Sequence, residues 1–185
     1  MAILANIVNE VKDGLVAVVK GTGEITNEAI NVVHDTVVNT LKSGGDVAAT
    51  TVDVSSSVAQ GVVIGASETG ISVVDAARKG TKAIVGGVTE VGGDAIDASI
   101  HAVNGAVKGA SQVGTEVGSV AVGAVQGTID AAGEVGADVT EVTKRAVVSA
   151  VEAAEEISTE TANAVRNALT SAISGAKEIL GAPLK

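Results

Sequence analysis

The residues that could take part in chemistry are few, and their spacing fits no common catalytic or metal site. The chain has two histidines, His34 and His101, and no cysteine. No Glu-x-x-His or His-x-x-x-His pair is present, although that spacing would bring two metal ligands to one face of a helix. The phosphate-binding pattern Gly-x-x-x-x-Gly-Lys-Ser/Thr is absent despite 23 glycines, and we expect no buried base beside the serines as in a hydrolytic triad. We therefore expect a non-enzyme with no catalytic residue, metal ligand or cofactor.

The composition narrows the classes of partner. The 185 residues include no Phe, Tyr or Trp, so any core must be built from many small contacts instead of large ring contacts. The formal net charge is −10. Binding of nucleic acid needs clustered basic residues and stacking rings, so no nucleic-acid partner is expected. The same charge disfavours strongly anionic membranes.

The sequence leaves the cellular location open. Residues 1–9 are apolar but lack a basic leading segment, so a Sec-type signal peptide is not expected. The longest uncharged run, residues 54–67, is shorter than the roughly 20 residues of a membrane-spanning helix. These features predict no transmembrane span and either a cytoplasmic protein or one exported without such a signal.

An eleven-residue repeat runs along the whole chain, and it sets the elements that would position any functional residue. Eleven residues make three helical turns at about 3.67 residues per turn, so the repeat keeps one stripe on one side of a nearly straight helix. Five of the eleven phases together contain no charged residue, no His and no amide side chain, which predicts an apolar half-cylinder. One phase of this predicted assembly face comprises Val8, Val19, Ile30, Leu41, Val52, Val63, Val74, Val85, Ile96, Val107, Ile129, Val151 and Ile173.

This pattern predicts an all-α chain with one or two very long amphipathic helices packed in an assembly. We expect a single helical region over residues 1–182 and a tail over residues 183–185, because Pro183 ends the pattern. The glycines and β-branched residues lower helix propensity, so we expect the helix to order only on a partner surface. The alternative is an antiparallel four-helix bundle with glycine hinges near residues 44–45, 86–93 and 133–136. The apolar phase continues across these hinges. This favours the long helix, because a hairpin loop has no need to preserve the phase.

Small residues at helical spacing predict close helix contacts. Gly61 and Gly65 are four residues apart, and Gly105 and Gly109 repeat that spacing 44 residues later. Small residues four apart allow two helix backbones to approach each other.

The polar side carries charge of different sign on its two edges. Such edges suit helices that lie side by side, and each exposed pair would set register more than strength. The line between the edges is acidic and includes Glu68, Glu90, Glu134 and Glu156. The basic edge carries Lys12, Arg78, Lys144, Arg166 and Lys177, and the acidic edge carries Glu28, Asp94, Glu116, Asp138 and Glu160.

Residues 88–136 carry a resemblance to known proteins. The segments that carry it are Val-Thr-Glu-Val-Gly-Gly, Gly-Ala-Val-Lys-Gly-Ala and Gly-Ala-Val-Gln-Gly-Thr. They resemble the eleven-residue-repeat segments of synucleins and perilipins. The resemblance implies a long amphipathic helix that lies on vesicles or lipid droplets. Unlike those families, this chain is acidic and has no Lys-Thr-Lys-Glu-Gly-Val motif.

Two functions follow from the apolar half-cylinder. The first is a structural protein that binds further copies of itself and forms a filament, tube or sheet. The alternative is a lipid-droplet, granule or membrane-surface coat that lies flat on a neutral apolar interface. A third interpretation, a surface-active ice-binding helix, rests on threonines of the apolar face at irregular spacing.

Overall fold

The computed structural model of the chain describes residues 2–19, 25–43 and 47–181. Within these residues the backbone forms nine α-helices and no β-strand, so the expected all-α class is confirmed. The helices are α1 (Ala2–Val19), α2 (Asn27–Ser43), α3 (Val47–Thr69), α4 (Val73–Glu90), α5 (Ala95–Gln112), α6 (Val117–Val135), α7 (Val139–Glu155), α8 (Thr159–Ala172) and α9 (Ala176–Gly181).

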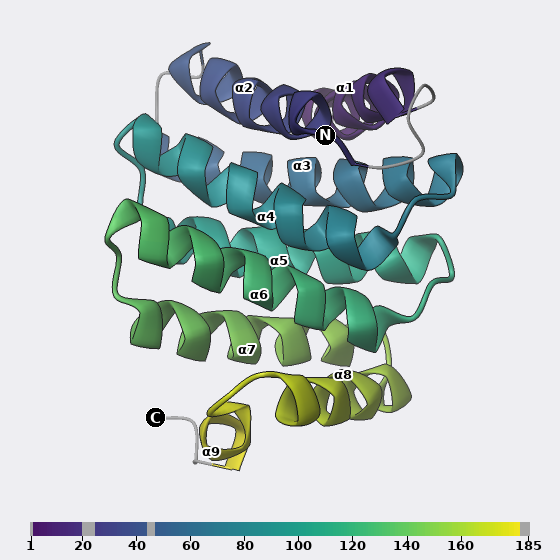
Figure 1. Ribbon diagram of the computed structural model, residues 1–185, viewed down its shortest axis with the longest axis vertical. Helices are drawn as coiled ribbons and strands as arrows, with labels where there is room; N and C mark the ends of the chain where they lie inside the picture. Colours follow the sequence, from purple (N-terminus) through teal and green to yellow (C-terminus); the bar gives the residue numbers. More distant parts are fainter. Residues whose placement is uncertain (1, 20–24, 44–46, 182–185) are drawn as a thin grey trace.

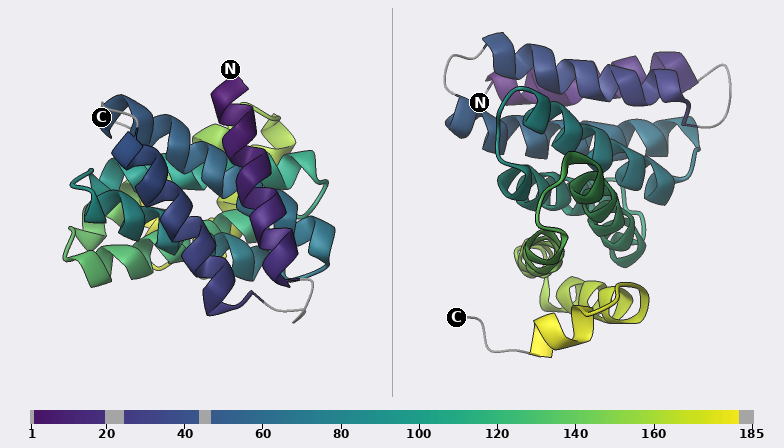
Figure 2. Two further views of the ribbon diagram at one scale, coloured as in Figure 1. Left: turned by 90° about the horizontal axis from the view of Figure 1, so that it is seen from above. Right: turned by 60° about the vertical axis from the view of Figure 1, so that its left-hand side comes forward.

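The helices stack in two layers. Consecutive helices run back and forth, from α1 and α2 at one end of the stack to α8 and α9 at the other (Figure 1). Odd-numbered helices form one layer and even-numbered helices the other, as the side view in Figure 2 shows. Each helix makes its largest contact with the helix two places away in the chain rather than with its immediate neighbour. The architecture is therefore a helical repeat array in which each helix rests on the one two before it.

The expected very long helix is wrong, because glycine turns interrupt it at regular intervals. Gly70, Gly92, Gly114 and Gly136 adopt positive φ angles of 68–83°, which residues with a Cβ rarely adopt. They lie 22 residues apart, which is two eleven-residue repeats. From α4 to α6, each helix and its turn together thus occupy 22 residues, so these turns preserve the apolar phase. Contrary to the expectation from the sequence, hairpin turns here do keep phase.

The four-helix alternative places too few breaks. Gly92 ends α4, but Gly86 and Gly87 lie inside that helix. Gly136 ends α6, whereas Gly133 lies inside it. The hinge at residues 44–45 and the tail at 183–185 lie outside the described residues.

The acidic edge coincides with the starts of helices. Asp94 Oδ1 accepts hydrogen bonds from the backbone N–H groups of Ile96 and Asp97, at 2.8 and 2.9 Å. Asp138 caps α7 in the same way, and Glu116 is the N-cap residue of α6. Glu28 and Glu160 lie in the first turns of α2 and α8, where negative charge is favourable to the helix dipole. Four of these acids lie 22 residues apart, so the acidic edge marks the starts of successive helices.

The apolar half-cylinder is buried inside the chain itself, between and within the two layers. Among the residues of the predicted assembly face, one set is fully buried, a second set is partly buried, and Val52 is 37% exposed. The buried set repeats mostly every 22 residues: Val19, Leu41, Val63, Val85, Val107, Val151 and Ile173. The partly buried set is Val8, Ile30, Val74, Ile96 and Ile129.

Because the apolar residues cover one another within one chain, the protein is expected to fold without a partner surface. We expect a dilute, lipid-free sample to show strong helical circular dichroism and one cooperative thermal transition. Helicity should not depend on protein concentration. A coil spectrum that becomes helical only on added lipid would contradict the fold.

Candidate functional site

A short motif recurs in five successive helical units and joins each of them to the helix two before it. Two small residues lie four apart, and an acid or its amide follows three residues later; we call this the docking motif. Each copy lies 22 residues after the previous one. The copies are Gly61, Gly65 and Glu68; Ala83, Gly87 and Glu90; Gly105, Gly109 and Gln112; Gly127, Ala131 and Glu134; and Ser149, Ala153 and Glu156.

The small residues of the docking motif lie where two helix backbones nearly touch. A Cβ atom added at Gly61 would lie 2.7 Å from the carbonyl oxygen of Val8 in α1. A Cβ atom added at Gly105 would overlap the carbonyl oxygen of Ser56 in α3. The close approach expected from such spacing therefore occurs between helices of the same chain. Gly65 and Gly109 make similar contacts, with the carbonyl oxygens of Lys12 and Gln60 each 3.2 Å from an added Cβ.

In the four motifs that carry an acid, that acid reaches a basic side chain on the helix that the motif contacts. These pairs join helices two apart and are partly exposed, so each contributes less than about 1 kcal/mol and mainly sets the register. The pairs are Glu68 with Lys12 at 3.7 Å, Glu90 with His34 Nε2 at 3.1 Å, Glu134 with Lys82 at 2.6 Å, and Glu156 with Lys108 at 2.9 Å.

The basic edge divides into paired and unpaired members. Arg78 binds Asp130 of α6 through Nε and a terminal nitrogen, at 2.9 and 2.8 Å. Arg166 of α8 lies 3.7 Å from Glu155 of α7. Lys144 and Lys177 are exposed and make no ion pair with a described residue. The basic residues that do pair thus find acids within the same chain.

Substitution at Gly105 tests the backbone contact. We expect Gly105→Ala to destabilise the fold by about 2–3 kcal/mol, because the new methyl group must push α5 away from α3. Gly86→Ala is the matched control, since Gly86 is also inside a helix but a Cβ there meets nothing within 4 Å. The control should gain up to about 1 kcal/mol from helix propensity. Urea unfolding of both variants measures the difference, and equal effects would refute the close contact.

Buried hydroxyl groups form a second kind of link between helices. Thr81 Oγ1 lies 3.0 Å from the carbonyl oxygen of Ala124 in α6. Ser149 Oγ donates to the carbonyl oxygen of Ile100 in α5 at 2.8 Å. Ser55 Oγ, in contrast, is fully buried and has no hydrogen-bond partner among the described residues. An unpartnered buried hydroxyl costs stability.

We expect Ser55→Ala to stabilise the protein by about 1 kcal/mol, because the change removes an unsatisfied polar atom. Ser99, 44 residues later, is the matched control: it is equally buried, but its Oγ donates to the carbonyl oxygen of Ala95 at 2.7 Å. Ser99→Ala should leave stability unchanged or slightly lower. The midpoints of urea unfolding compare the two, and a loss of stability in Ser55→Ala would contradict the assignment.

Two of the surface hollows are lined wholly by described residues. The first, which we call the α2–α4 groove, has a volume of about 360 Å³ and lies between α2 and α4 beside the end of α6. Asn27, Ile30 and Asn31 form one wall, and Lys79 and Lys82 stand on the other. None of these residues belongs to the docking motif, so the motif does not predict the groove.

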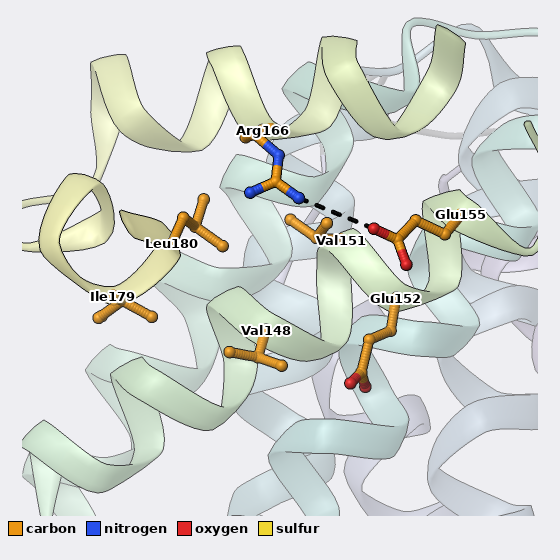
Figure 3. Close-up of a pocket in the computed structure, with 7 residues that line it drawn as sticks. All are labelled: Val148, Val151, Glu152, Glu155, Arg166, Ile179 and Leu180. Atoms are coloured by element: carbon orange, nitrogen blue, oxygen red, sulfur yellow. Dashed lines mark ion pairs between the residues drawn. The ribbon is translucent and has the colours of Figure 1, made fainter. Parts of the chain in front are cut away.

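The second hollow, which we call the terminal cleft, lies between α7, α8 and α9 and has a volume of about 110 Å³ (Figure 3). Its apolar side chains come from α7 and α9, and the Arg166–Glu155 ion pair crosses its rim. It is lined by Val148, Val151, Glu152, Glu155, Arg166, Ile179 and Leu180.

Potential metal ligands do not gather in the part of the chain that the structure describes, where no group of three His, Cys, Asp or Glu residues lies together. His34 is held between Glu90 and Asp35, whereas His101 is partly buried on α5. Over the same residues no helix is both long and apolar enough to cross a membrane.

The 22-residue spacing was a missed signal in the sequence. Turn glycines, N-cap acids and docking motifs all repeat at this interval, which is the length of a helix plus its turn. The eleven-residue period shows the apolar stripe but does not show that two such periods make one helix and its turn. The two hollows have no such signal, because each forms where the repeat is interrupted.

Comparison with known proteins yields a likeness of fold. No protein-family model and no curated protein sequence matches the chain. Among solved structures, the chain is similar to the crystal structure of a de novo designed helical repeat protein, DHR7. The identity is 17%, the TM-score is 0.54, and the match covers 91% of this chain and 95% of the other. At this identity the match shows a helical repeat fold and carries no function.

Proposed function

We propose that the chain is a structural, non-catalytic helical repeat protein that associates with a second copy through its C-terminal end. The docking motif is the observation that supports a structural role. It places small residues, and four acids that form ion pairs, at contacts between helices. These residues therefore hold the stack together.

In this fold, the surface open to another copy is not the apolar stripe expected from the sequence. The apolar stripe is covered within the chain, so association by that stripe would require the helices to separate. The N-terminal end is polar, with exposed Asn9 and Asp13 on α1 and exposed Asn31 and Asp35 on α2. A polar outer face of this kind is what ends a repeat array in water. The N-terminal end is therefore a poor surface for association.

The C-terminal end keeps more apolar surface. In the odd layer the position after α7 is held by α9, which has six residues where α5 and α7 have 18 and 17. Val139, the first residue of α7, and Ile157, in the turn after α7, are 39% and 37% exposed. Together with the apolar wall of the terminal cleft, they supply a surface that a second copy can cover across a two-fold axis.

A lipid-surface coat is the second proposal. It is supported by the continuous apolar phase, because unpacked hairpins would present that stripe to an oil surface. It requires the two layers to open, whereas association through the C-terminal end leaves them closed. A change in helix packing on lipid separates the two proposals.

The test uses two exposed apolar residues of equal exposure at different places in the stack. Light scattering on the full chain is expected to show a dimer at high concentration. We expect Ile157→Lys to raise the dissociation constant at least tenfold, which is about 1.4 kcal/mol, by placing a charge in the contact. Val52→Lys, also 37% exposed but on α3, should leave the dissociation constant unchanged.

A strictly monomeric protein at every concentration would overturn the dimer. Equal effects of the two lysines would remove the C-terminal end as its site. Flotation with neutral lipid droplets, accompanied by loss of the cooperative thermal transition, would favour the lipid coat instead.

A further inference from the structure

We propose that the α2–α4 groove binds a small anion through carboxylate or phosphate oxygens. The proposal is independent of the association proposed above. It rests on the position of the groove in the repeat, on the side chains that face it, and on an ammonium group there that makes no ion pair with a described residue.

The groove lies where α4 carries side chains at two positions that are close-packing glycines in α6. At the corresponding α4–α6 contact, 44 residues later, Gly123 and Gly127 let the helices close. A Cβ at Gly123 would lie 2.6 Å from the carbonyl oxygen of Val74, and one at Gly127 would overlap that of Arg78. In α4 the same two positions carry side chains, those of Lys79 and Ala83, and both line the groove.

A shift in register adds to this difference. In the later helices the small residue faces a carbonyl oxygen 49 positions earlier, as Gly127 faces Arg78. In the N-terminal hairpin the offset is 53 positions, as Gly87 faces His34. The helix α3 has 23 residues, compared with 17–19 in α4 to α7, so the preceding hairpin is displaced by one turn, about 6 Å. The start of α4 faces the close-packing Gly123 and Gly127 of α6. The start of α2 faces no such glycines in α4.

The charges that face the groove leave one ammonium group available. Lys82 is neutralised by Glu134 at 2.6 Å, and His34 is flanked by Glu90 and Asp35. Lys79 Nζ donates to the carbonyl oxygen of Ile25 at 3.4 Å and makes no ion pair with a described residue. In a chain of net charge −10, a lysine left without an acid beside a hollow is a site where an anion gains a charge-assisted hydrogen bond.

The remaining lining residues suit a small ligand. Asn27 and Asn31 bring side-chain amides, which can donate to anion oxygens. Ile30 and Ala83 supply a short apolar surface, and a Cβ at Gly86 would meet nothing within 4 Å, which leaves room for the ligand. A carboxylate with a short apolar stem and a bare phosphate both meet this chemistry.

The test is a titration of the isotope-labelled full chain, followed by backbone amide chemical shifts. Sodium butyrate and sodium phosphate are the probes, with sodium chloride at equal ionic strength as the reference. We expect saturable shifts at the start of α2 and in α4 from Lys79 to Gly86. Saturation by butyrate alone would assign the site to an organic acid, and saturation by phosphate would assign it to the bare anion. No saturable shift, or equal shifts at every helix start, would overturn the proposal.

Two variants separate the site from general charge effects. Lys79→Gln should weaken binding at least fivefold, whereas Lys144→Gln, at an exposed lysine that also lacks an ion pair, should leave it unchanged. Gly86→Leu should abolish saturable binding by filling the groove while preserving the thermal transition, because the added side chain enters open space. Equal effects of the two lysine variants, or unchanged binding in Gly86→Leu, would refute the site.

Discussion

The close approach of helix backbones at small residues is the contact on which the rest of the fold depends. Without aromatic rings, the core cannot fill wide gaps between helices, so the helices must approach until backbone meets backbone. Gly105 and Gly127 show the limit of this approach, because neither has space for one methyl group. The need for a small residue at one position in each of α3 to α7 explains why the docking motif recurs every 22 residues.

Charge and capping follow from that contact. Once the small residues set the distance between helices two apart, the acid three positions later reaches a base on the facing helix, as Glu134 reaches Lys82. The acids at the opposite end of each unit cap the next helix, as Asp94 does for α5. Acidic residues therefore have two separate structural tasks in one repeat. This division explains why they recur with regular spacing in a chain that has no recognisable catalytic pattern.

The departures from the repeat are where surface chemistry appears. Lys79 stands in α4 where α6 has the close-packing Gly123, and it lines the α2–α4 groove. The short α9 leaves α7 partly uncovered at the terminal cleft. A regular array buries its own contact surfaces, whereas an irregular unit can leave a hollow or an apolar patch. The proposed anion binding and the proposed association each use one of these two departures.

The sequence by itself determined the helical class and the apolar stripe, because eleven-residue periodicity follows from helix geometry alone. It also marked Gly61, Gly65, Gly105 and Gly109 as contact residues, since their spacing places them on one face. Only the tertiary structure decided that the stripe is buried by other helices of the same chain. A helix and its turn fill two whole repeats, so a continuous helix and a folded stack have the same periodicity. The offset of the N-terminal hairpin depends on packing between residues about 50 positions apart, which no local pattern encodes.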